Sequence, residues 1–200
     1  MEAPRVETAS VADRDRVIQV ITLGFLADPV GRWVWPDARM YLETMPKFVA
    51  AFGGKAFEHG SAYVADAYRA AALWLPPGVE PDGDTIEALL DASVAPEIQQ
   101  DVVSFFAQMD DYHPHEPCWY LPLIAADPAY RGGGLGSAIL QHALQRCDED
   151  GTIAYLESSN PRNISLYQRH GFEVIGEIQA GSSPVMYPMI RRRGHLLKAA

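Results

Sequence analysis

The sequence is poor in cysteine, in basic residues and in long apolar runs. Its two cysteines, Cys118 and Cys147, are too few for a disulfide framework, and we read them as packing residues. Acidic residues outnumber Lys and Arg by 26 to 16, and the net charge of −10 argues against a nucleic-acid-binding surface. No apolar run approaches membrane-spanning length, and the N-terminus lacks the pattern of a signal peptide. We therefore expect a cytoplasmic protein without nucleic-acid or membrane partners.

The chain contains enough apolar residues to form a hydrophobic core. Of its 200 residues, 48% are hydrophobic, and we expect residues 1–200 to form one domain. Strand and helix patterns alternate along the chain, which indicates a mixed α/β sheet. Strands are expected at 5–8, 61–65, 70–75, 118–126, 152–157, 172–178 and 185–190, the second and third of them as a hairpin. After the last strand, RRRGHLLKAA is expected to be a solvated tail.

The most informative stretch is CWYLPLIAADPAYRGGGLG, which runs from Cys118 to Gly136. It predicts a buried strand, a turn at Asp127-Pro128 and a glycine-rich entry into a helix. Glycines at a helix start let the backbone turn sharply and present free N–H groups to an anion, and the helix dipole adds to the attraction. The expected ligand is a phosphate or pyrophosphate.

Three phosphate-binding patterns compete for this loop. A P-loop requires a Lys after its last glycine, but Ser137 follows Gly136, so that interpretation fails. In the dinucleotide pattern G-x-G-x-x-G the third glycine would fall on Ile139 or on Ser137. Glu157 does lie about 20 residues on, where a ribose-binding acid would stand, so a nucleotide-cofactor oxidoreductase stays open.

The third pattern, R/Q-x-x-G-x-G/A, is matched by Arg131, Gly134 and Gly136. It resembles the pyrophosphate loop of the GNAT superfamily of N-acetyltransferases. Downstream, Asn160, Leu166-Tyr167 and Gly171-Phe172 resemble the second GNAT signature, N-x-x-x-x-x-L-Y-x-x-x-G-F. The segments LESSNPRN and LYQRHGF resemble those of the branch that includes puromycin-type antibiotic acetyltransferases.

The resemblance implies a GNAT fold, which is a mixed, mostly antiparallel central sheet flanked by helices, with the fourth and fifth strands splayed apart. It also implies acetyl-CoA as the acyl donor, with its pantetheine arm in that gap. Pro122 departs from the usual strand and removes one N–H. Carried over by motif, the residues expected to hold the donor are Ile124, Ala125, Ala126, Arg131, Gly132, Gly133, Gly134, Leu135, Gly136, Ser137, Asn160 and Tyr167.

The same resemblance assigns catalytic roles. Tyr167 matches the general acid that protonates the coenzyme A thiolate, and a phenol is still protonated at neutral pH. Glu157 is the candidate general base because it ends the strand beside the splay; a structural anchor is the alternative role. A water relay through Tyr120 or His113 could replace it as base. The expected reaction is direct attack by the amine in a ternary complex.

The acceptor site is marked by no motif. In the GNAT fold the first helices overlie it, so Trp33, Trp35, Tyr41 and Tyr120 are candidate acceptor contacts, with core packing as the alternative for each. The run HPHEPC, 113–118, superficially resembles a metal cluster, but its two prolines hold it extended, so no metal is expected. The resemblance implies acetyl transfer to a primary amine on a small molecule and makes a homodimer plausible. A non-catalytic acyl-CoA sensor is the second reading.

Overall fold

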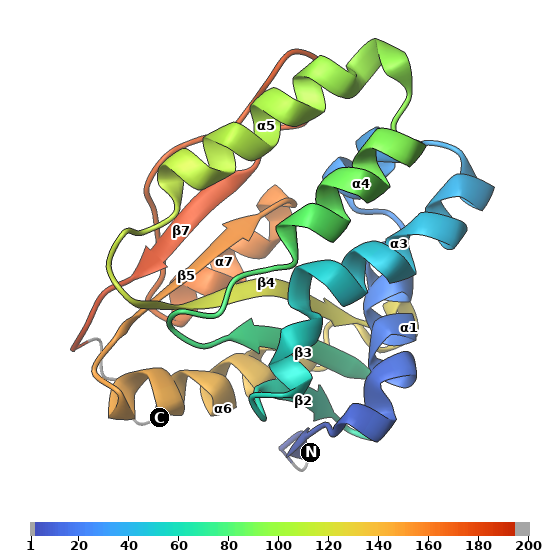
Figure 1. The fold of residues 1–200 in the computed structure, drawn as a ribbon. Helices are drawn as coiled ribbons and strands as arrows, with labels where there is room; N and C mark the ends of the chain where they lie inside the picture. The colour runs from blue at the N-terminus through green and yellow to red at the C-terminus, as the bar shows by residue number, and fades with distance from the viewer. Residues whose placement is uncertain (1–2, 195–200) are drawn as a thin grey trace.

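The computed structural model describes residues 3–194 and is built around a seven-stranded sheet, with strand order β1-β2-β3-β4-β5-β7-β6 (Figure 1). The strands are β1 (Val6–Thr8), β2 (Ala62–Ala65), β3 (Ala70–Leu75), β4 (Cys118–Ala126), β5 (Ile153–Ser158), β6 (Glu173–Val174) and β7 (Tyr187–Arg191). The α-helices are α1 (Arg14–Gly24), α2 (Pro29–Val34), α3 (Ala38–Gly53), α4 (Gly83–Ser93), α5 (Gln99–Tyr112), α6 (Leu135–Glu149) and α7 (Ile164–Arg169). Short 3₁₀ turns are η1 (Val11–Asp13), η2 (Gly54–Phe57), η3 (Pro96–Ile98), η4 (Pro128–Tyr130) and η5 (Pro161–Asn163).

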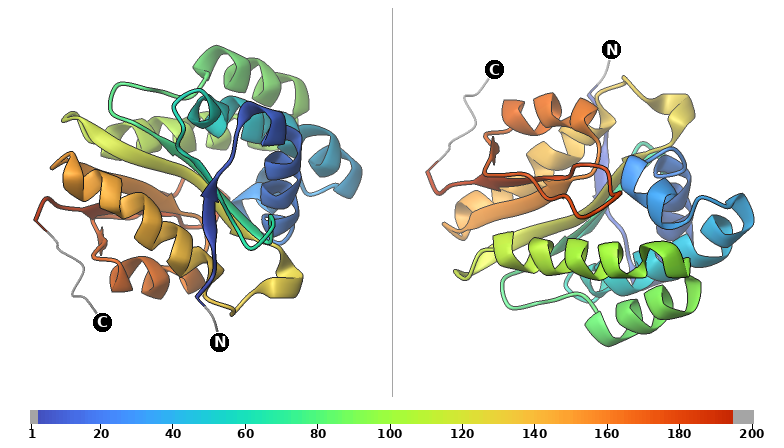
Figure 2. Two further views of the ribbon diagram at one scale, coloured as in Figure 1. Left: turned by 90° about the horizontal axis from the view of Figure 1, so that it is seen from below. Right: turned by 90° about the horizontal axis from the view of Figure 1, so that it is seen from above.

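The helices cover both faces of the sheet (Figure 2). One apolar cluster joins α1, α3, α4 and α5 to one face, and a second joins α6 and α7 to the other. This is the layered arrangement expected when each face of a sheet is apolar. Within residues 3–194, no helix has the length and apolar character needed to cross a membrane.

Local sequence signals explain the first helices. Ser10 and Asp13 form a capping box at the start, and Val17, Ile18 and Ile21 are buried as their spacing predicts. From the apolar spacing alone we expect the stripe to continue to Phe25 and Leu26, but α1 ends at Gly24 and Phe25 is its C-cap. A new short helix, α2, starts at Pro29 instead.

The predicted hairpin of β2 and β3 is confirmed as an antiparallel pair, with Ala65 opposite Ala70. Between β3 and β4 the register shifts, because Leu73 lies opposite Leu123 but Leu75 lies opposite Tyr120. Pro122 falls within this irregularity, as expected for a residue that has no N–H to donate. The register is regular again from Leu123 to Ala126.

The splay of β4 and β5 is confirmed. The two strands are parallel, and among the described residues they pair only from Cys118 with Ile153 to Tyr120 with Tyr155. Beyond that point β4 continues to Ala126 and β5 to Ser158 without pairing. The remaining neighbours in the sheet are antiparallel, so the predicted mixed, mostly antiparallel sheet is also confirmed.

The end of the sheet is shorter than predicted. Of the strand expected over 172–178, β6 contains two residues, and a single bridge joins Ile178 to Met186. Residue Gln179, which follows Ile178, contacts α5. The side chain of Gln108 donates to the Gln179 carbonyl at 2.9 Å and accepts from the Gln179 N–H at 3.1 Å. Of the predicted tail, residues 195–200 lie outside the described residues.

Candidate active site

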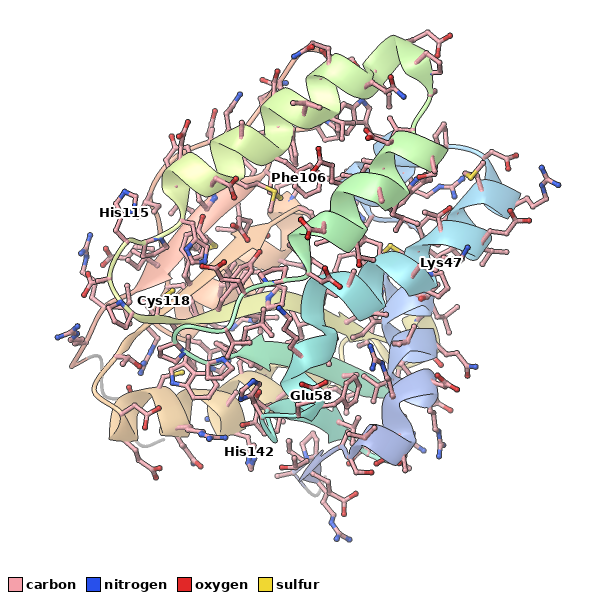
Figure 3. The ribbon with its side chains drawn as sticks, in the orientation of Figure 1. Lys47, Glu58, Phe106, His115, Cys118 and His142 are labelled. Atoms are coloured by element: carbon pink, nitrogen blue, oxygen red, sulfur yellow. The ribbon has the colours of Figure 1, made fainter. Side chains whose placement is uncertain are left out.

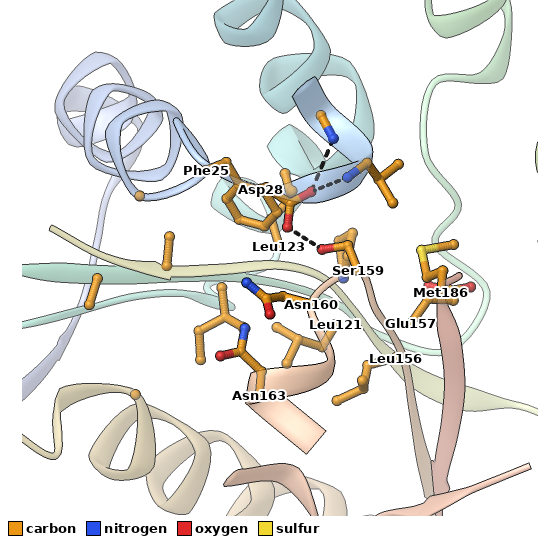
Figure 4. A pocket seen from close by; sticks show the side chains of 18 of the residues that line it. Phe25, Asp28, Leu121, Leu123, Leu156, Glu157, Ser159, Asn160, Asn163 and Met186 are labelled. Carbon is orange, nitrogen blue, oxygen red and sulfur yellow. Dashed lines mark hydrogen bonds between the residues drawn. The ribbon is translucent and has the colours of Figure 1, made fainter. Parts of the chain in front are cut away.

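One cavity of about 610 Å³ lies where β4 and β5 separate (Figure 4). Its wall begins at the glycine loop before α6, continues along β4, β5 and α7, and ends among α2, α3, α4 and α5. It therefore extends from the glycine loop to the apolar helices on one face of the sheet.

The glycine loop ends where α6 begins. Gly132 and Gly134 have φ of +80° and +77°, a left-handed conformation that glycine adopts without strain. An added Cβ at either position would meet nothing within 4 Å, so the glycines are needed for conformation rather than for space. The first N–H groups of α6 have no intrahelical partner. Its N-cap residue, Gly134, has no side chain that could accept a hydrogen bond from them. Of the loop residues predicted to bind the donor, Gly133 alone does not line the cavity.

Arg131 ties this loop to the N-terminal half of the chain. Its guanidinium donates a 2.6 Å hydrogen bond to the carbonyl of Gly24, the last residue of α1. Arg162 and Arg169 also line the cavity. Three cationic side chains thus line the same cavity as the start of α6, which suits an anionic ligand.

Strand β4 forms one side of the gap. Ile124, Ala125 and Ala126 line the cavity in the part of β4 that has no partner on β5. At Gly24, an added Cβ would lie 2.5 Å from the Cβ of Ala125, so α1 rests directly on the strand.

Asn160 and Tyr167 both line the cavity from the far side of the gap. Asn160 caps the turn after β5, because its side-chain oxygen accepts from the Arg162 N–H at 3.1 Å. Figure 4 shows this side chain at the edge of the gap. Tyr167 is buried, and burial, with a smaller contribution from the charge of Asp28, raises the pKa of its phenol. Tyr167 therefore stays protonated at neutral pH.

Glu157 lines the cavity at the end of β5 that faces the apolar helices. Its Oε2 accepts a 2.8 Å hydrogen bond from the hydroxyl of Tyr120. Burial raises the pKa of Glu157 to about 7, although the hydrogen bond from Tyr120 lowers it in part. A carboxyl with this pKa gains and loses a proton near neutral pH, which suits a general base.

The four aromatic residues predicted to contact the acceptor have different environments. Trp35 lines the cavity, and its indole N–H donates to Ser93 at 2.9 Å. Trp33, Tyr41 and Tyr120 do not line it. Tyr41 is fully buried and donates to the Thr22 carbonyl, so it packs α3 onto α1. Tyr120 contacts the cavity residue Glu157, to which its hydroxyl donates. The indole N–H of Trp33 donates to the hydroxyl of Ser182.

Asp28 was not among the site residues expected from the sequence. It is buried and lines the cavity, and its Oδ1 accepts the N–H groups of Val30 and Gly31. Its Oδ2 accepts the hydroxyl of Ser159 at 2.5 Å. Burial raises the pKa of Asp28 above its usual value, and these hydrogen bonds oppose the rise. A helix-capping Asp before Pro was the available signal, but nothing local indicated a partner after β5.

The HPHEPC segment begins at the end of α5, where His113 packs against aromatic rings. His113 ends α5, and its ring packs edge-on against Tyr120 and Tyr155, with centroids 5.1 Å apart in both cases. In residues 3–194, no group of three or more His, Cys, Asp and Glu side chains is arranged to hold a metal ion. His113 thus contacts Tyr120, which in turn donates a hydrogen bond to Glu157.

Comparison with known proteins shows a family match in the middle of the chain. Residues 97–172 match the model of the acetyltransferase (GNAT) family, and this range contains α5, β4, the glycine loop, α6, β5 and α7. This part of the chain is thus similar to GNAT acetyltransferases. The structure of a histone acetyltransferase HPA2 and related acetyltransferase from Corynebacterium glutamicum shares the fold of this chain, with a TM-score of 0.72, 24% identity, and coverage of 96% of this chain and 98% of that one. A polyamine N-acetyltransferase from Drosophila melanogaster has a TM-score of 0.66 and 15% identity, with coverage of 94% and 99%.

Sequence relatives match this chain over shorter stretches. N-alpha-acetyltransferase 50 from Danio rerio is 32% identical over 69 residues, which are 32% of this chain and 41% of that protein. Mycothiol acetyltransferase from Streptosporangium roseum is 35% identical over 66 residues, which are 32% of this chain and 20% of that protein. The chain thus spans less than half the length of these relatives. The oxidoreductase reading loses support, because a dinucleotide-binding fold has a parallel sheet and here β4 and β5 are the one parallel pair among the described strands.

Proposed function

We propose that this protein transfers an acetyl group from acetyl-CoA to a primary amine on a small molecule, by direct attack in a ternary complex, with residues 1–200 as one domain. One observation carries the proposal: the gap between β4 and β5 connects the cationic glycine loop with the buried carboxyl of Glu157 inside a single cavity. A thioester held in this gap would have an anion-binding loop at one end and a proton acceptor at the other.

The donor is held by the chain's own backbone in this scheme. The free N–H groups at the start of α6 and Arg131, Arg162 and Arg169 suit the diphosphate of coenzyme A. The unpaired stretch of β4 offers backbone groups to the amides of the pantetheine arm, as an added strand would. The N–H of Ile124 is the candidate donor to the oxyanion that forms on the thioester carbonyl.

The chemistry needs two proton transfers. Glu157 takes a proton from the ammonium group of the acceptor, and the freed nitrogen lone pair attacks the thioester carbon. When the carbon–sulfur bond of the tetrahedral intermediate breaks, the electron pair goes to sulfur and the hydroxyl of Tyr167 donates the proton that makes the thiol. The attacking nitrogen loses its second proton as the intermediate collapses, and this proton restores the hydroxyl of Tyr167, while the proton on Glu157 passes to solvent. The products are the N-acetyl amine and coenzyme A.

Relatives support an amine acceptor. Structures that share this fold include enzymes named for polyamines, agmatine and arylalkylamines. A non-catalytic acyl-CoA sensor stays the second candidate, because it would keep the loop but has no need of a buried Tyr167 or Glu157. Membership of the puromycin-type branch, a cytoplasmic location and a homodimer stay predictions.

The test measures thermal shift with acetyl-CoA, coenzyme A and NADH, then thiol release with a panel of amines. The panel contains aminoglycosides, puromycin-like nucleosides, polyamines, arylalkylamines, amino acids and peptides with free N-termini. Stabilisation by acetyl-CoA together with amine-dependent thiol release is the expected result. Stabilisation without release for any amine would favour the sensor, and stabilisation by NADH alone would end the proposal.

A further inference from the structure

The cavity has two chemically different halves. One half contains the glycine loop with Arg131, and Arg162 and Arg169 add cationic lining from η5 and α7. The half beyond Glu157 is apolar and comes from helices on the opposite face of the sheet. Its lining residues include Trp35, Phe48, Phe52, Leu90, Phe105 and Phe106. The acceptor has to enter this second half, because the first is the donor's in the proposed reaction.

A continuous row of aromatic rings leads through the apolar half to the carboxyl. Trp35 packs edge-on against Phe48 at 5.6 Å between ring centroids, and Phe48 stacks on Phe52 at 5.0 Å. Phe52 in turn packs edge-on against Tyr120 at 6.0 Å. The hydroxyl of Tyr120 donates to Glu157, so the row ends on the proton acceptor. An acceptor whose nitrogen reaches Glu157 therefore has its body beside aromatic rings.

The opposite wall is equally apolar. It is formed by α5, with Phe105 buried and Phe106 half-buried, and Figure 3 shows the labelled Phe106 between α5 and α4. Leu90 on α4 completes this side of the cavity. A flat or branched hydrocarbon group would contact apolar atoms on both sides.

Carboxylates are scarce in this cavity. Among the lining residues of the described chain, Asp28 and Glu157 are the two acids. Asp28 already accepts hydrogen bonds from the backbone of α2 and from Ser159. A second ammonium group on the acceptor would therefore lie among hydrocarbon without a partner, at a large cost in free energy.

We propose that the acceptor is a primary amine that carries one positive charge and an aromatic or bulky apolar body, rather than a polyamine, agmatine or aminoglycoside. This inference rests on the proposed acetyl transfer. The amine nitrogen approaches Glu157, and the body occupies the space between the aromatic row and α5. Each additional methylene buried there raises kcat/KM about 4-fold.

The test compares amines that differ by one charge. Alkylamines and α,ω-diamines of equal chain length, with 2-phenylethylamine and agmatine beside them, are assayed for thiol release from acetyl-CoA. We expect kcat/KM for each alkylamine to exceed that of its diamine by at least about 100-fold, with 2-phenylethylamine among the best substrates. Equal or faster turnover of the diamines would overturn the inference while leaving acetyl transfer intact. Absence of release with every amine would overturn the acetyl transfer itself.

A variant tests whether this half of the cavity sets the preference. Phe106→Asp adds a carboxylate to it, and Val103→Asp adds the same charge to an exposed position of α5 outside the lining. We expect Phe106→Asp to raise the diamine-to-alkylamine ratio of kcat/KM at least 10-fold and Val103→Asp to leave it unchanged. Because both amines are measured on one preparation, this ratio does not depend on the folded fraction, and Leu90→Asp provides a second variant. An unchanged ratio in Phe106→Asp and Leu90→Asp, or faster turnover with long-chain acyl-CoA than with acetyl-CoA, would overturn the inference, since the apolar half would then serve another group.

Discussion

Ser159 donates its hydroxyl to Asp28 at 2.5 Å, which joins the segment after β5 to the start of α2 across the mouth of the gap between β4 and β5. The two residues are 131 positions apart in the chain. Because Asp28 also caps α2, one buried carboxylate holds two walls of the cavity together.

Replacing Asp28 tests this link. Asp28→Asn keeps an oxygen for the α2 cap and an amide that Ser159 can bond, so it should cost less than about 1 kcal/mol in the free energy of unfolding. Asp28→Ala removes both functions and should cost about 1–2 kcal/mol. Chemical denaturation measures both values, and a double-mutant cycle with Ser159→Ala should give a coupling energy above about 0.5 kcal/mol. Additive effects would show that the pair does not interact.

The pH dependence should report Glu157. With a pKa of about 7, its base form increases as pH rises, so kcat/KM should climb through about pH 7. Glu157→Gln should lower turnover about 10²-fold or more and remove that limb. Tyr120→Phe removes a hydrogen bond that lowers this pKa, so the limb should move to higher pH. A limb that persists in Glu157→Gln would assign the base to another group.

The same carboxyl should affect stability with a definite sign. Its pKa rises from 4.5 to about 7 on folding, so the folded protein holds this proton more tightly than the unfolded chain. Its contribution is therefore most favourable below about pH 4.5 and is lost as pH rises to about 7. The difference in unfolding free energy between Glu157→Gln and the parent should grow in favour of the variant over this range, as denaturation at several pH values would measure. A constant difference would contradict the shift.

Tyr167→Phe separates chemistry from binding. We expect turnover to fall about 10²-fold or more with coenzyme A affinity nearly unchanged, because the ring stays and the proton donor is lost. Steady-state kinetics and calorimetric titration measure the two effects. Tyr187→Phe, on β7 and outside the cavity lining, is the matched control and should leave both values unchanged. Turnover unaffected by Tyr167→Phe would remove this residue from the mechanism.

The glycine loop should respond to backbone conformation rather than to bulk. Gly134→Ala places a side chain at a φ of +77°, at a cost of about 1–2 kcal/mol, and should raise KM for acetyl-CoA at least about 10-fold. Gly133→Ala has no positive φ to overcome, and its Cβ would lie 3.4 Å from the carbonyl of Tyr130, so its effect should be smaller. Equal effects of the two substitutions on KM would contradict the conformational explanation.

Most strands and helices, and the loop that suits a diphosphate, followed from local patterns. Capping by Ser10, Asp13 and Asn160 and the glycines before α6 act within a few residues, so their spacing is visible in the sequence. The short β6 was not visible, because the residues around it favour a strand, whereas Gln179, shortly after it, is hydrogen-bonded to Gln108 on α5.

By itself, the sequence predicted an anion-binding loop and a tyrosine that could donate a proton, since both predictions depend on contiguous motifs and on the ordinary protonation of a phenol. The tertiary structure alone decided the contact of Asp28 with Ser159, the burial that brings the pKa of Glu157 near neutrality, and the aromatic row from Trp35 to Tyr120. The reason is physical: a pKa and an apolar cavity depend on which distant segments exclude water together, and no local spacing encodes that meeting.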